Sequence, residues 1–336
     1  MNLTQFNPLK CLTYADKIQT ILDGDIPVPV LVNLDLTNRC NYKCRHCSVE
    51  KYISNRVEMS RVVASKIINE LADYGMQSII FSGGGEPTTH PNFLQIIQLA
   101  ADRGMKIGLA TNGSLLYKFV GKLPLKSFRY IRVSFDAGCK ETYTKIHNAQ
   151  EGDFERVLSV ATYFNECQVG MGFLVTADNY LEIPAAINLA ATHKFDYVSI
   201  RPAVYGKTPS ESQLKTASDA SNNFTSQASV KVYPLKYRFQ SLTNREKHPC
   251  RATPLTAVIT ADGELNICCQ HRGNPAYQWG NLCQESFKSL WDNQLHRALI
   301  KEVENRPCPD CACKLLHYNE IIEKVFVKDT MHLGFL

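Results

Sequence analysis

The sequence predicts an α/β fold in which a partial (β/α)6 barrel of the TIM type carries a small C-terminal domain. Short apolar runs alternate with amphipathic segments over residues 30–204, and most of the cysteines gather in one group before residue 50 and another after residue 249. Alternating strands and helices imply parallel pairing, with functional loops after the carboxyl ends of the strands. A chain of 336 residues with 44% hydrophobic residues is long enough for both parts.

Six strands and the helices between them follow from the hydrophobic pattern. Ser60 is placed to cap the first clear helix and Gly75 to end it. The helical signal between the third and fourth strands is weak. The strands are expected at 30–36, 78–82, 106–110, 130–135, 169–175 and 197–200, and the helices at 60–74, 93–103, 154–164 and 181–191.

A polar segment rich in Ser, Thr, Asn and Gln separates the barrel from the second group of cysteines. We interpret residues 205–235 as a linker or lid, between the barrel at 30–204 and the C-terminal domain at 236–336. Residues 1–29 are then an N-terminal extension. In the C-terminal domain we expect a hairpin at 258–267 and a helix at 287–303.

Charge and cysteine content restrict the class of protein. The net charge of +5 is spread along the chain without a basic run, so nucleic acid is not an expected partner. Neither a signal peptide nor a membrane span is visible, which predicts a cytoplasmic location. In that reducing compartment the 13 cysteines are better interpreted as metal ligands or reactive thiols than as disulfides.

Cys40, Cys44 and Cys47 follow the first predicted strand with C-x3-C-x2-C spacing, so one compact loop presents three thiolates. Three thiolates on a cluster of four irons leave one iron open to a chelating ligand, whereas zinc sites favour paired C-x2-C units. The loop resembles that of the radical S-adenosylmethionine (SAM) superfamily, in which an aromatic residue or His, here His46, precedes the third cysteine. The resemblance implies a [4Fe-4S] cluster and bound SAM.

Polar loops after the later strands resemble further motifs of the superfamily. Gly84, Gly85 and Glu86 match its GGE-P motif, whose backbone holds the amino group of SAM. Asn112 and Ser134 match its TNG and S-x-D motifs. By resemblance all five residues are cofactor contacts, although Asn and Ser at strand ends equally serve as caps and turns.

Three more positions are candidate cofactor contacts. His147 stands where relatives place an arginine that pairs with the SAM carboxylate, so either His147 is protonated or Lys145 or another cation takes over. Asn179 and Arg201 follow the fifth and sixth strands, where relatives place polar groups of the cofactor or substrate site. Asn179 equally caps a helix, and Arg201 equally is a solvated loop charge.

The C-terminal cysteines indicate a second metal site. Cys250 and Cys268 bracket the predicted hairpin, and Cys308 and Cys311 form a later C-x2-C pair. The layout resembles the SPASM and Twitch extensions of radical SAM enzymes, and we expect the shorter Twitch form, with one auxiliary [4Fe-4S] cluster on these four cysteines. Cys313 is an alternative to either member of the pair. Taken alone, four such cysteines equally form a structural zinc site.

The resemblance implies a radical SAM oxidoreductase or epimerase. The family reduces SAM by one electron to a 5′-deoxyadenosyl radical, which abstracts hydrogen from a substrate carbon. We expect a polar small molecule such as a sugar, aminocyclitol or nucleotide-like compound, because fewer than forty residues precede Cys40 and leave no room for a leader-peptide-binding domain. A ribosomal peptide is the alternative substrate, and a zinc-binding interaction module without catalysis is the alternative function.

The partners and the fate of the substrate radical follow from the same resemblance. An external one-electron reductant of the flavodoxin or ferredoxin type is expected. Oxidation of the radical by the auxiliary cluster gives dehydrogenation, whereas return of hydrogen from a thiol gives epimerisation. Cys269 and Cys313 are the candidate hydrogen donors, because neither is required as a cluster ligand.

Overall fold

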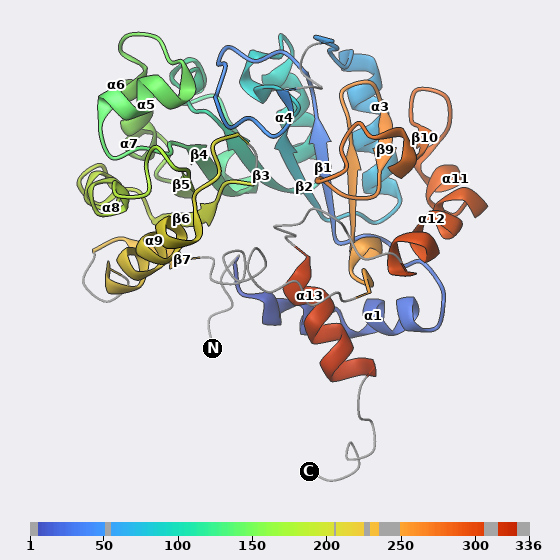
Figure 1. Ribbon diagram of the computed structural model, residues 1–336. Helices are drawn as coiled ribbons and strands as arrows, with labels where there is room; N and C mark the ends of the chain where they lie inside the picture. Colours follow the sequence, from blue (N-terminus) through green and yellow to red (C-terminus); the bar gives the residue numbers. More distant parts are fainter. Residues whose placement is uncertain are drawn as a thin grey trace.

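One continuous sheet of ten strands organises the protein. The computed structural model describes residues 6–50, 55–204, 206–224, 229–234, 249–305 and 315–327. The strand order is β10-β9-β8-β1-β2-β3-β4-β5-β6-β7, and every pair from β8 to β7 is parallel. The parallel strands curve as an open barrel, with helices around the outer side (Figure 1). The fold class predicted from the sequence is therefore confirmed.

All six predicted strands are present, and a seventh follows them. The barrel strands are β1 (Leu31–Asp35), β2 (Ser78–Ser82), β3 (Lys106–Thr111), β4 (Phe128–Ser134), β5 (Gln168–Val175), β6 (Tyr197–Pro202) and β7 (Lys231–Pro234). The barrel helices are α3 (Arg61–Asp73), α4 (Phe93–Asp102), α5 (Lys140–His147), α6 (Asp153–Leu158), α7 (Val160–Tyr163), α8 (Ile183–Thr192) and α9 (Glu211–Phe224). Short 3-10 turns lie between β3 and β4, in place of the weakly marked helix expected there.

Helix α3 shows how local sequence sets these boundaries. The hydroxyl of Ser60 accepts a hydrogen bond from the backbone N–H of Val63, which caps the first turn. Ile67 and Leu71 are fully buried on the face that packs against the sheet. Gly75 then adopts φ +92°, a conformation that ends the helix with little strain.

The segment predicted as a linker or lid belongs partly to the barrel, so this expectation is wrong. Residues 211–224 form α9, and residues 231–234 form β7, which pairs in parallel with β6. The polar composition hides the helix because its small residues face inward. Ala217 and Ser221 are buried, and the hydroxyl of Ser221 donates to the carbonyl of Ala217.

The C-terminal region extends the same sheet. The predicted hairpin is β8 (Thr256–Ile259) and β9 (Glu264–Asn266), and β10 (Gln278–Asn281) continues it. Strand β8 pairs in parallel with β1, with Leu31 opposite Thr256. The helix predicted at 287–303 is two helices, α11 (Phe287–Trp291) and α12 (Gln294–Asn305).

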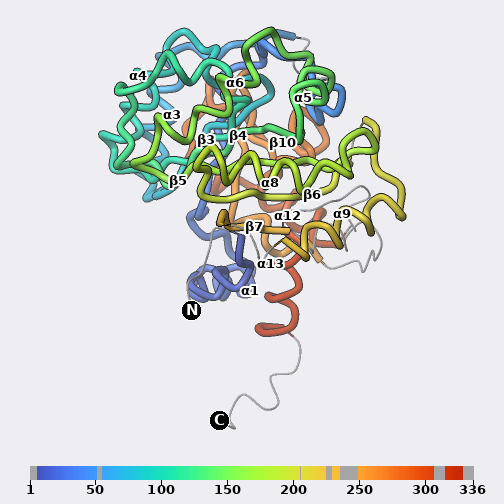
Figure 2. Tube along the Cα trace, turned by 90° about the vertical axis from the view of Figure 1, so that its left-hand side faces the viewer, coloured from blue at the N-terminus to red at the C-terminus, as the bar shows by residue number. Residues whose placement is uncertain are grey.

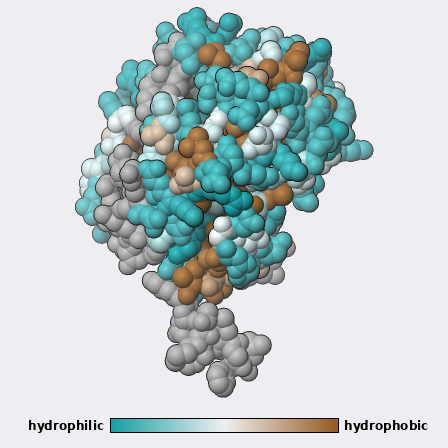
Figure 3. Space-filling model, turned by 90° about the vertical axis from the view of Figure 1, so that its right-hand side faces the viewer, coloured by the Kyte–Doolittle hydropathy of each residue, from teal (hydrophilic) through white to brown (hydrophobic). Residues whose placement is uncertain are grey.

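The N- and C-terminal helices meet below the barrel. A 3-10 helix (Pro8–Tyr14) and α1 (Ala15–Leu22) lie beside α13 (Leu316–Ile321), as Figure 2 shows. The small core between them includes Cys11, Ile18 and Ile322, the last from the π-helical turn that follows α13. Hydrophilic residues cover most of the face around α3, α11 and α12, with apolar residues in small separate groups (Figure 3). In the described ranges, no helix has the length and apolar character needed to cross a membrane.

Candidate functional site

The loop that carries the first three cysteines lies directly after β1 and is attached to α5. The backbone N–H of Arg45 donates to the carbonyl of Ile146 at 3.0 Å. The hydroxyls of Tyr42 and Tyr143 lie 3.1 Å apart in the interior. The loop is thus held at the carboxyl end of the barrel, where parallel sheets place their active sites.

Cys40, Cys44 and Cys47 face one cavity. Burial raises the pKa of Cys40 to about 11, and burial together with the neighbouring sulfurs of Cys40 and Cys47 raises the pKa of Cys44. Such thiols ionise readily only beside a cationic partner such as iron. Across the described ranges, no three His, Cys, Asp or Glu side chains are close enough to hold a single metal ion.

His46 lies in the same cavity and contacts Asp136. Its Nε2 is 3.2 Å from Oδ2 of Asp136, which is buried and has φ +59°. Burial acts to raise the pKa of Asp136, but the hydrogen bond and charge of His46 hold it below its ordinary value. The carboxylate therefore fixes the imidazole beside the cysteine loop, where it can contact a bound cofactor.

His147 is held by contacts within the protein. Its Nε2 donates to the carbonyl of Phe135 at 2.9 Å, and its Nδ1 lies 3.2 Å from Sγ of Cys44. Burial lowers the pKa of His147. Nε2 of His147 also lies 3.5 Å from Oδ2 of Asp136, so both ring nitrogens have partners within the protein. That His147, Lys145 or another cation pairs with the carboxylate of SAM stays a prediction.

The glycine loop after β2 packs against the backbone that precedes Cys40. The N–H of Gly85 donates to the carbonyl of Thr37, and the N–H of Glu86 donates to the carbonyl of Arg39. A side chain on Gly85 would collide with the Arg39 carbonyl, and one on Gly84 would collide with the Asn38 side chain. The glycines allow this close approach and leave their backbone exposed to the cavity.

Glu86 holds the loops after β2 and β3 together. Its Oε1 accepts hydrogen bonds from Thr88 and from the Thr111 hydroxyl, and its Oε2 accepts from the N–H of Asn112 at 2.7 Å. Burial raises the pKa of Glu86, and these donors offset part of the rise. The side chain of Asn112 donates to Asn41 in the cysteine loop. Glu86 and Asn112 thus join the predicted motifs into one network, which leaves Glu86 little capacity for a ligand.

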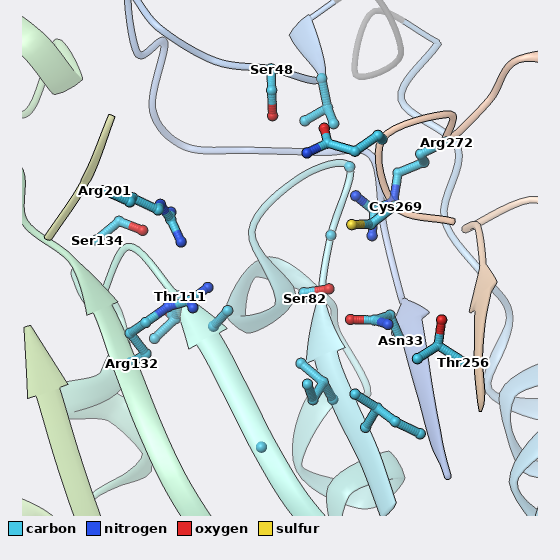
Figure 4. Close-up of a pocket in the computed structure, with 18 of the residues that line it drawn as sticks. Asn33, Ser48, Ser82, Thr111, Arg132, Ser134, Arg201, Thr256, Cys269 and Arg272 are labelled. Carbon is cyan, nitrogen blue, oxygen red and sulfur yellow. The ribbon is translucent and has the colours of Figure 1, made fainter. Parts of the chain in front are cut away.

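A cavity of about 790 Å³ extends from the cysteine loop along the inner face of β1–β4. The predicted contacts Ser134 and Arg201 line it, and Figure 4 shows both side chains directed into it beside Arg132. Asn179 does not line it. The buried amide of Asn179 donates to the carbonyls of Asp136 and Leu174, so the structure corrects its predicted role from contact to support of the loop.

The C-terminal cysteines are only partly described. Cys308, Cys311 and Cys313 lie outside the described residues, so their predicted roles stay predictions. Burial raises the pKa of Cys250, whose Sγ lies 2.7 Å from the Thr253 hydroxyl.

The side chains of Cys269 and its sequence neighbour Cys268 point in different directions. Cys269 lines the cavity wall opposite Arg132 and Arg201, and its sulfur is visible in Figure 4. Cys268 packs against the core. Cys269 therefore faces the cavity, and its role as a hydrogen donor stays a prediction.

Several residues that shape the site were not predicted from the sequence. Arg132 lines the middle of the cavity, and the buried pair Asp35 and Arg272 joins β1 to the loop after β9. A charged residue within the predicted strand 130–135, two positions before Ser134 and so on the same face, is the signal that could have revealed Arg132. No local signal links Asp35 to Arg272, which lie far apart in the sequence.

Comparison with known families agrees with this geometry. A model of the radical SAM superfamily matches residues 34–184, and a model of the SPASM iron–sulfur cluster-binding domain matches residues 250–313. Among curated relatives, Fe-coproporphyrin III synthase of Methanosarcina barkeri is 33% identical over 184 residues, which are 53% of this chain and 44% of that protein. The match thus spans less than half of the relative's length.

Longer matches are more distant. One such match is the tungsten-containing aldehyde ferredoxin oxidoreductase cofactor-modifying protein of Pyrococcus furiosus. It is 20% identical to this chain, and the match covers 84% of this chain and 86% of that protein. Streptococcus suis SuiB bound to precursor peptide SuiA superposes with a TM-score of 0.68 at 18% identity, covering 94% of this chain and 76% of SuiB. The structure of anSMEcpe with bound AdoMet and Cp18Cys peptide gives 0.62 at 17% identity, covering 87% and 88%. The chain thus contains a radical SAM domain at residues 34–184, which implies a [4Fe-4S] cluster and SAM in the barrel, and a SPASM domain at residues 250–313, which implies auxiliary iron–sulfur.

Proposed function

We propose that this enzyme removes a hydrogen atom from a carbon of a peptide. The observation that carries the proposal is the cavity that joins the three cysteines of the barrel loop to Cys269 of the C-terminal domain. The peptide complexes of SuiB and anSMEcpe support the choice, because their folds cover most of this chain. The polar small molecule expected from the sequence has weaker support than this alternative.

The chain's own residues bind and orient the reactants. When bound, the [4Fe-4S] cluster and SAM supply a 5′-deoxyadenosyl radical. Gly84 and Gly85 present backbone groups to the cofactor, His46 is fixed by Asp136, and Ser134 provides a hydroxyl nearby. The remaining cavity holds the substrate carbon and excludes water.

Two fates of the substrate radical are balanced in atoms and electrons. In the first, Cys269 gives its S–H hydrogen back to the carbon, and the sulfur radical then takes one electron from an external reductant and one proton from water. In the second, which gives dehydrogenation, an iron–sulfur cluster held by the SPASM domain would supply the acceptor for one electron of the carbon radical, and solvent would take one proton. The position of Cys269 on the cavity wall favours the first fate, which is epimerisation.

The test is transfer of deuterium from peptide to cofactor product. Anaerobically reconstituted enzyme is reduced and mixed with SAM and pools of pentapeptides deuterated at carbon. Deuterium in 5′-deoxyadenosine shows that a peptide C–H bond is broken. If unlabelled 5′-deoxyadenosine forms with every peptide pool but carries deuterium from labelled sugars or nucleotides, the small-molecule substrate is correct and the peptide proposal fails.

A further inference from the structure

The barrel cavity is strongly basic. Counting the described residues that line it, seven are Lys or Arg and two are acidic, Glu50 and Glu86. Glu86 is buried and accepts hydrogen bonds from its own loops. Glu50 is exposed, as are Lys43, Lys106 and Arg129, which leaves Lys10, Arg132, Arg201 and Arg272 as the less exposed basic residues of the lining. The interior of the cavity therefore has a positive potential that favours an anionic ligand.

Arg132 lies in the middle of this cavity, below the level of the SAM motifs. It precedes Ser134 by two residues on β4, which places it about 7 Å deeper along the strand on the same face. A Cβ atom added to Gly172 would lie 3.8 Å from Cγ and Cδ of Arg132, which is ordinary contact distance, so the stem of Arg132 passes beside the backbone of β5. Figure 4 shows the guanidinium directed into the cavity, on the same side as Arg201.

Within the part of the chain that the structure describes, no carboxylate is paired with the charge of Arg132. Arg272, another basic residue of the lining, is paired with Asp35. Arg132 is half-buried, and across the described ranges it has neither a hydrogen bond nor an ion pair. A guanidinium withdrawn from water without a partner is unfavourable unless an anion reaches it.

We propose that Arg132 binds the side-chain carboxylate of an Asp or Glu residue in the substrate peptide. The inference rests on the proposed function, because it takes the substrate to be a peptide. The anionic side chains of a peptide are the carboxylates of its Asp and Glu residues. A guanidinium can bind a carboxylate through two parallel hydrogen bonds, which fixes orientation as well as charge. Anchoring the peptide at Arg132 would hold a neighbouring carbon beneath the SAM site.

The experiment compares two matched pools of deuterated pentapeptides, amidated at the C-terminus. One pool has Asp or Glu at the central position and the other has Asn or Gln. We expect deuterium transfer into 5′-deoxyadenosine to be about tenfold greater from the acidic pool, the ratio that one charge-assisted hydrogen bond gives. In Arg132→Gln the ratio of deuterium transfer from the acidic pool to that from the amide pool falls to about one. In Arg132→Lys, which keeps the charge but cannot form two parallel hydrogen bonds, the ratio is intermediate.

Arg129→Gln is the matched control. Arg129 lies on the same strand but at the exposed outer end of the cavity, so the acid-to-amide ratio should stay as in the parent enzyme. Because each ratio compares two pools on one protein, a general loss of activity cancels. Equilibrium binding of both pools to each SAM-loaded variant is measured by saturation-transfer NMR, so the preference is also read without turnover.

The outcomes separate this inference from the proposed function. Equal deuterium transfer from the two pools, or an unchanged ratio in Arg132→Gln, overturns the role of Arg132 and leaves the peptide function standing. If no pool transfers deuterium, the peptide function fails. In that case, the affinities of the SAM-loaded parent enzyme for glutarate and for glutaramide are compared, to decide whether Arg132 selects carboxylates. Equal affinities for the two compounds overturn the inference as well.

Discussion

Arg272 and Asp35 form a buried ion pair between the C-terminal domain and the first barrel strand. Nη2 of Arg272 donates to Oδ1 of Asp35 at 3.1 Å, and Nε lies 2.5 Å from Oδ2 without the alignment of a second hydrogen bond. Burial raises the pKa of Asp35, and Arg272, the N–H of Gly84 and Ser82 counter that rise. The pair thus connects the loop that carries Cys269 to the glycine loop of the SAM site.

Removing one partner of this pair should destabilise the protein more than removing both charges. In Arg272→Met a carboxylate with no exposed area loses its counter-charge, so the free energy of unfolding should fall by about 3 kcal/mol. The double variant Asp35→Asn, Arg272→Met leaves no buried charge and should recover much of that loss. Thermal unfolding of the anaerobic enzyme measures both. Equal losses in the single and double variants would contradict the coupling.

The backbone approach at Gly85 should not tolerate a methyl group. In Gly85→Ala the new Cβ collides with the carbonyl of Arg39, which is backbone and cannot rotate away, so SAM affinity should fall by about tenfold or more. Gly121→Ala is the control, because a Cβ added to Gly121 would have no atom within 4 Å, and only its φ of +70° opposes the substitution. It should cost about 1 kcal/mol of stability and leave SAM binding unchanged. Equilibrium dialysis with labelled SAM distinguishes the two.

Replacing Cys40, Cys44 and Cys47 together with Ala should abolish SAM cleavage and remove about four irons per chain. The auxiliary iron–sulfur signal should persist in Mössbauer spectra, because its predicted ligands lie after residue 249. Cys167→Ala, outside the cavity, is expected to keep both the iron and the cleavage. Full cleavage by the triple variant would refute the assignment of the cysteine loop.

The hydrogen donor can be identified in deuterated water. If Cys269 returns hydrogen, the product should carry one non-exchangeable deuterium at the inverted carbon. Cys269→Ala should still cleave SAM but lose that product, whereas Cys139→Ala, also outside the cavity, should retain it. Mass spectrometry of the product decides. An oxidised product without carbon-bound deuterium, unchanged in Cys269→Ala, points instead to loss of the electron to the auxiliary site.

His296 predicts how the stability of the C-terminal domain depends on pH. Its ring stacks on Trp279, with centroids 4.2 Å apart, and its Nδ1 donates to the carbonyl of Trp291. Burial lowers its pKa to about 4 from the ordinary 6.5. Between pH 6.5 and pH 4 the imidazole of His296 is therefore protonated in the unfolded chain but neutral in the folded protein. As a result, the free energy of unfolding falls as pH drops through this range, by about 1.4 kcal/mol per pH unit.

Urea denaturation at pH 7.5, 6.0 and 5.0 measures this slope. In His296→Gln the free energy of unfolding should depend less steeply on pH between 7.5 and 5.0, because the uptake of one proton on unfolding is lost. Leu295→Gln, an exposed neighbour on the same helix, should keep the parent slope. A parent-like slope in His296→Gln would show that this imidazole does not carry the effect.

The features that depend on neighbouring residues in the sequence could be predicted from local sequence patterns. Strand and helix periodicity, with signals such as Ser60 and Gly75, located the barrel elements, and the cysteine and glycine motifs located the cofactor loops. What depends on distant partners could not be predicted, as the pair of Asp35 and Arg272 shows. His147 and Asn179 occupy motif positions, but their contacts with Phe135 and Asp136 depend on how the loops pack.

The parallel pairing of β1 with β8 has a consequence for synthesis of the chain. Until β8 emerges from the ribosome, β1 is an edge strand whose unpaired N–H and C=O groups are open to association with other chains. The strand synthesised first thus waits for a partner from the final third of the sequence, and this long-range contact slows completion of the fold. A truncated barrel without the C-terminal domain would keep that edge open and aggregate, so the domain that carries the auxiliary iron–sulfur site also serves as the barrel's cover.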